Sequence, residues 1–135
     1  MNTLSVRNQQ RAHRIASREF KKAATIALEQ LFNAPSYHLS VAFVSAKRMA
    51  EVNEAHLQHE GPTDIITFDY SETGVLDGEL LICPAVAAEY SQRYNVSLGR
   101  ELARYFIHGV LHLQGHDDHA PDDSRRMKQE EYRLL

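Results

Sequence analysis

Segments with helical spacing alternate with short β-branched runs along this chain, and their order constrains the fold more than any other feature. Apolar residues recur every three or four positions over residues 11–33, which predicts an amphipathic helix. Residues 39–44, 64–68 and 79–83 carry the short apolar runs typical of strands, and the last two could pair across the loop between them. The sheet is therefore expected to be small.

Capping and turn residues divide the rest of the chain into helices. Ser45 can cap a helix that runs to about Leu57, and Pro84 can open one that runs to about Tyr94. A long helix is predicted over residues 98–113 and a short one over residues 121–135. We therefore expect an α+β fold, with a small mixed β-sheet of about four strands and helices mainly on one face.

Size and composition favour one folded domain over residues 1–135, because a chain of 135 residues can build one hydrophobic core but hardly two. An apolar share of 43% and a charged share of 24% are typical of globular proteins. Cys83 has no second cysteine to pair with, and we find neither a secretory signal nor an apolar run long enough to cross a membrane. These features predict a cytoplasmic protein with no membrane partner.

Charge is distributed unevenly along the chain. Nine acidic residues and no Lys or Arg lie between Glu51 and Glu89, so an anionic partner is expected to bind the ends of the chain rather than its middle. The alternative is that the basic residues are ordinary solvated surface. The basic residues available to bind such a partner are Arg7, Arg11, Arg14, Arg18, Lys21 and Lys22.

The chemically informative segment lies at the end of the helix predicted over residues 98–113. His108 and His112 are four residues apart, which places both rings on one helix face, one turn apart, as two ligands of one metal ion require. Gly115 permits a reversal that would bring Asp118 or His119 back towards the pair. We therefore predict one Zn²⁺, or another divalent ion, with three protein ligands and an open position.

A metal with an open position would lower the pKa of a bound water to about 7 and so support hydrolysis. A metalloprotease would carry Glu directly after the first histidine as its general base, but this chain has Gly109 there, so peptide hydrolysis is not expected. The alternative is that a histidine pair at this spacing is a chance surface network.

The same segment resembles the signature of the YbeY family of endoribonucleases, H-G-x-L-H-L-x-G-x-D-H, which residues 108–117 (HGVLHLQGHD) match position by position. Asn53 with residues 62–68 (PTDIITF) is similar to a second family segment, and residues 78–82 (GELLI) to a family strand. The likeness spans about residues 39 to 132.

The resemblance implies a single-strand-specific, metal-dependent endoribonuclease in ribosomal RNA maturation, acting late on the 3′ end of the small-subunit RNA, and in ribosome quality control. Its expected partners are single-stranded RNA, ribosomal RNA and the ribosomal small subunit, and no DNA. The ion would polarise a phosphodiester oxygen and activate its water. Asp117, Thr63 and Asp64 are the candidate catalytic residues: Asp117 could orient a ligand histidine or cap the turn, and the other two could line the cleft or simply start a strand.

The sequence departs from the family pattern at two places. The third ligand histidine of the family falls six residues after the second, where this chain has Asp118, so we predict Asp118 as the ligand and His119 as the alternative. Near Leu57 many members carry an arginine that helps to bind or cleave RNA. His56 and His59 could replace part of that role or be incidental.

Two other functions compete with the nuclease hypothesis. The chain could be a ribosome-assembly or RNA-binding factor in which the metal is structural, and Leu57 and Gly109 both favour that alternative. It could also hydrolyse a small ester or amide.

Overall fold

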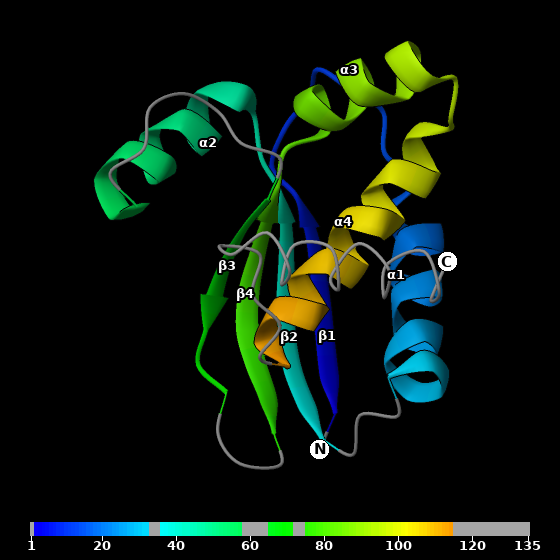
Figure 1. Cartoon of the computed structure of the whole chain (residues 1–135), viewed down its shortest axis with the longest axis vertical. Helices are drawn as coiled ribbons and strands as arrows, with labels where there is room; N and C mark the ends of the chain where they lie inside the picture. The colour runs from blue at the N-terminus through cyan, green and yellow to red at the C-terminus, as the bar shows by residue number, and fades with distance from the viewer. Residues whose placement is uncertain (1, 33–35, 58–64, 72–74, 115–135) are drawn as a thin grey trace, which may run out of the picture.

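The computed structural model describes residues 2–32, 36–57, 65–71 and 75–114 (Figure 1). Ten elements follow one another in these residues: β1 (Thr3–Asn8), α1 (Ser17–Ile26), η1 (Ala27–Leu31), β2 (Tyr37–Phe43), α2 (Ala46–Val52), η2 (Asn53–Leu57), β3 (Ile65–Asp69), β4 (Leu76–Ile82), α3 (Pro84–Tyr94) and α4 (Leu98–Leu113). The η segments are single π-helical turns that continue α1 and α2.

The four strands form one mixed sheet in the order β1-β2-β4-β3. β1, β2 and β4 run parallel, and β3 pairs antiparallel with β4 across the loop, as predicted. The predicted α+β class with a small mixed sheet is therefore confirmed. The helix predicted over residues 121–135 lies outside the described residues.

Two sequence-based expectations about the amino end were wrong. The strand β1 was not predicted, because only two of its residues, Leu4 and Val6, are apolar. Its extended conformation depends on parallel pairing with β2. The first helix begins at Ser17 rather than near residue 11. Gln10 explains the delay, because its buried side-chain amide donates to the His13 carbonyl oxygen at 2.7 Å and accepts from the His13 main-chain N–H at 2.9 Å. These bonds hold a turn where the helix would otherwise start.

One face of the sheet carries the main core, and α1 and α4 cover it (Figure 1). Side chains alternate between the faces along each strand, so Val41 and Leu80, which are register partners, both point to this face. Phe20 of α1 meets Phe43 edge-on at a ring separation of 5.0 Å and Phe106 of α4 at 5.8 Å. These contacts join both helices to the sheet.

Among the described residues, α2 packs against the second face, and the start of α3 joins the same cluster. Met49 and Val52 of α2 pack with Ala42 and Ile66 of the strands. Ser45 caps α2 as predicted, because its hydroxyl accepts the Arg48 main-chain N–H at 3.1 Å. The prediction that helices lie mainly on one face is confirmed.

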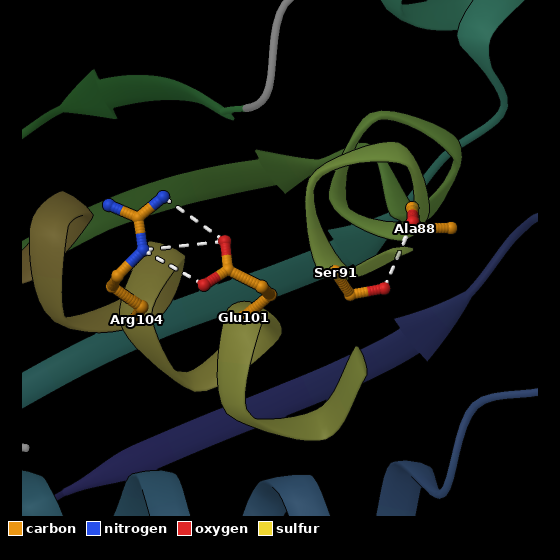
Figure 2. Close-up of polar contacts among 4 residues, drawn as sticks. All are labelled: Ala88, Ser91, Glu101 and Arg104. Atoms are coloured by element: carbon orange, nitrogen blue, oxygen red, sulfur yellow. Dashed lines mark hydrogen bonds and ion pairs between the residues drawn. The ribbon is translucent and has the colours of Figure 1, made fainter. Parts of the chain in front are cut away.

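A buried ion pair stabilises the junction between α3 and α4 (Figure 2). The Arg104 guanidinium donates to both carboxylate oxygens of Glu101, with an Nη2–Oε2 distance of 3.1 Å, and the Glu101 side chain is only 4% exposed. The same guanidinium lies 5.1 Å from the ring centres of Tyr90 on α3 and Tyr105 on α4. Arg104 therefore connects the two helices through charge and through cation–π contact.

Candidate metal centre

Gly109 allows α4 to lie unusually close to the sheet. A Cβ atom at this position would lie 2.3 Å from Leu80 Cδ2 on β4 and 2.9 Å from Ile65 Cδ1 on β3. Gly78 plays the matching role on β4, because a Cβ there would meet the Phe68 main-chain oxygen at 2.5 Å and Leu113 of α4 at 3.0 Å. Close packing therefore explains why glycine follows the first histidine, since any side chain there would collide with the sheet. The last turns of α4 lie directly against β4.

This packing leaves His108 and His112 together on an adjacent side of α4, both half-buried. Their Nε2 atoms lie 3.1 Å apart, and the ring centres are 4.8 Å apart at an interplanar angle of 70°. The predicted geometry, two imidazoles meeting one turn apart on one helix face, is what the structure shows.

The two nitrogen atoms fit a shared zinc ion. Zinc–nitrogen bonds of 2.0–2.1 Å at a tetrahedral angle place the two nitrogen atoms about 3.3 Å apart, and the observed Nε2–Nε2 distance is 3.1 Å. The same 3.1 Å separation also suits a hydrogen bond in which one Nε2 donates to the other.

The remaining predicted site residues lie outside the described residues: Asp117, Asp118, His119, Thr63 and Asp64. Within residues 2–32, 36–57, 65–71 and 75–114 no group of three or more potential metal ligands occurs. A third ligand from beyond residue 114 therefore stays a prediction. Leu57 closes η2, and its side chain, like that of His56, is not described; His59 lies outside the described residues.

The six basic residues do not form one helix face, although all six are exposed. Arg7 lies on β1 and is in register with Ala42, whose side chain belongs to the second face, away from α1. Arg11 and Arg14 precede α1, and only Arg18, Lys21 and Lys22 are on it. The late start of α1 explains why Arg11 and Arg14 lie outside the helix that was predicted over residues 11–33.

Sequence analysis missed Glu101 and Arg104, which lie one to two turns before His108 on α4. Arg104 lies one turn before His108, and its pairing with Glu101 anchors α4 against α3 (Figure 2). The signal was present as a Glu and an Arg three residues apart on a predicted helix. Burial of the pair, which gives it its importance, depends on α3.

No helix in the described part of the chain is both long and apolar enough to cross a membrane.

Comparison with known proteins identifies the family. The family described as "Endoribonuclease YbeY" matches residues 5–135. The chain is 42% identical over 93 residues to the endoribonuclease YbeY of Chlorobium luteolum, covering 69% of this chain and 68% of the relative. It is 37% identical over 117 residues to that of Bacteroides fragilis, covering 87% of this chain and 81% of the relative.

A solved structure supports the fold. The solution structure of TM1509 from Thermotoga maritima superposes with a TM-score of 0.69 at 24% identity, covering 98% of this chain and 86% of that one. At this identity the match speaks for the fold alone. The sequence matches, together with the histidine motif, place the chain in the endoribonuclease YbeY family, a family of nucleases among the hydrolases, as its sequence predicted.

Proposed function

We propose that this chain is a single-strand-specific, metal-dependent endoribonuclease that matures ribosomal RNA in the cytoplasm, at the 3′ end of the small-subunit RNA, and contributes to ribosome quality control. All 135 residues would serve as one hydrolase domain. The observation that carries the proposal is the convergence of the His108 and His112 Nε2 atoms at 3.1 Å on a helix of an endoribonuclease family member.

His108 and His112 would hold one Zn²⁺ together with Asp118, or with His119 in its place. The bound ion would supply Lewis acidity and a water of lowered pKa. The protein holds the two imidazoles in place, because Val110 on the same helix is fully buried and Gly109 seats the helix on Leu80. Ile107 and Leu111 bury the neighbouring side of α4 against Phe32, which keeps water from that flank.

The experiment compares metal content and RNA cleavage in the same preparations. The protein is stripped of metal, reconstituted with Zn²⁺, and tested on a single-stranded RNA and a DNA of the same sequence. His108→Ala and His112→Ala are expected to lose the ion and the cleavage of RNA. His38→Ala is the matched control, since His38 is an exposed histidine on β2 whose side chain forms a hydrogen bond with Thr3.

Mass spectrometry of Asp118→Ala and His119→Ala then identifies the third ligand, because only the variant that removes a ligand should lose the ion. Cleavage that persists unchanged in both histidine variants would refute a catalytic metal. If the reconstituted wild-type protein keeps its metal and its fold but cleaves no RNA, the alternative of an RNA-binding assembly factor is favoured instead.

A further inference from the structure

The second face of the sheet carries an open hollow of about 350 Å³ beside α2, on the side away from α4. This volume lies within the range of small-ligand sites, roughly 300–1,000 Å³. Its lining combines apolar, aromatic and charged side chains, among them Arg7, Ala42, Arg48, Phe68, Tyr70 and Glu79.

Strand register explains how these side chains come together. Arg7 pairs with Ala42 and Ala42 with Leu81, so the three form one row across β1, β2 and β4 on the second face. Phe68 pairs with Glu79 in the next row. β1 and β3 are the two edges of the sheet, and three strand spacings separate them by about 14 Å. Arg7 thus lies towards the β1 edge and the rings of Phe68 and Tyr70 lie towards the β3 edge, while Arg48 lines the hollow from α2.

We propose that this hollow binds a short stretch of single-stranded RNA, with a base against Tyr70 and Phe68 and backbone phosphates near Arg7 and Arg48. The inference rests on the proposed function, since it adds a second contact for the same substrate. Tyr70 is 55% exposed, which leaves its ring available for stacking. Any of the four bases can stack in this way once it is unpaired, so the contact would select single strands without selecting a sequence.

The charges of the hollow fit this occupant. Arg48 is paired with Glu51 at 3.6 Å, but both side chains are more than half exposed, so the pair is weak and a phosphate can compete for the guanidinium. Glu79 on β4 places a carboxylate between Arg7 and the rings, where it can accept from an amino group of a base. An acidic peptide could pair with the arginines, but the carboxylate of Glu79 would repel it.

The position of β3 connects the hollow to the histidine pair. Phe68 and Tyr70 lie along and just beyond β3, and Ile65 of the same edge strand contacts the Gly109 region of α4. A strand of RNA that leaves the hollow over the β3 edge would reach the face on which α4 lies. The second face would therefore hold the substrate while the first face cuts it.

The test measures binding without cleavage. Metal-stripped protein is titrated into a fluorescently labelled 12-nucleotide single-stranded RNA at several salt concentrations. Tyr70→Ala should weaken binding about 5- to 100-fold. Arg7→Ala should reduce the slope of log affinity against log salt by about 0.7. The controls are Tyr94→Ala, an equally exposed tyrosine at 56%, and Arg100→Ala, an exposed arginine outside the hollow.

A photo-crosslink from 4-thiouridine to Tyr70 or Phe68, with unchanged binding in both controls, would support the site. Unchanged affinity of the Arg7→Ala/Tyr70→Ala double variant, with metal-dependent cleavage intact, would overturn this inference and leave the proposed function standing. Equal competition by an acidic peptide of the same charge would overturn it too, because it would show a simple charged patch. A wild-type protein that binds no RNA would refute both.

Discussion

Replacing Gly109 by alanine tests whether close contact between α4 and β4 positions the histidine pair. A methyl group there would lie 2.3 Å from Leu80 Cδ2, whereas carbon atoms normally approach to about 3.5–4.0 Å. The two atoms would have to separate by more than about 1 Å. Leu80 is fully buried, so it has little room to move, and α4 itself is expected to shift.

The expected magnitude follows from two opposing effects. Alanine in place of glycine stabilises a helix interior by about 1 kcal/mol. Overpacking a filled core costs about 1–3 kcal/mol. The free energy of unfolding of Gly109→Ala should therefore fall by up to about 2 kcal/mol. Gly99→Ala in the same helix has no atom within 4 Å of the new methyl group, so it should gain about 0.4–1 kcal/mol.

Urea denaturation of both variants gives the comparison directly. Their midpoints should differ by roughly 1 M, since slopes for small proteins are about 1–3 kcal/mol per molar. Gly109→Ala should cost less in a Leu80→Ala background than in the wild type, because the side chain that meets the methyl group is gone. If Gly109→Ala were stabilised as much as Gly99→Ala, α4 could not be held against Leu80 as described.

Other substitutions test further features. Gly78→Ala should cost more than Gly109→Ala in the same urea assay, because its methyl group would meet a main-chain oxygen of β3 at 2.5 Å, which cannot turn aside. Arg104→Ala should destabilise by about 3–5 kcal/mol and Glu101→Ala by less, since the carboxylate left behind is the more deeply buried partner; equal losses would contradict this. Burial raises the pKa of Tyr37, and Glu29, which accepts its hydroxyl hydrogen bond at 3.3 Å, raises it further. The wild type should therefore lose stability relative to Tyr37→Phe as the pH rises above about 10, and parallel stability profiles would refute the shift.

Much of the fold could be predicted because local signals agreed with the final structure. Pro84 opens α3, and the helix predicted over residues 98–113 is α4, whose serine cap at Ser97 accepts the Arg100 main-chain N–H at 3.1 Å. β1 could not be predicted, because a short, mostly exposed edge strand carries little apolar pattern and forms only when β2 is present to pair with it.

The histidine spacing and the family signature alone were enough to predict a nuclease and the meeting of His108 and His112 on one helix face, because a helical turn is a local property that four residues define. Only the tertiary structure decided where the helical turn with His108 and His112 lies relative to the sheet. Gly109 and Gly78 bring α4 onto β4, and strand register places Arg7 on the opposite face from α1. Such arrangements depend on contacts between residues far apart in the chain, and no local pattern encodes them.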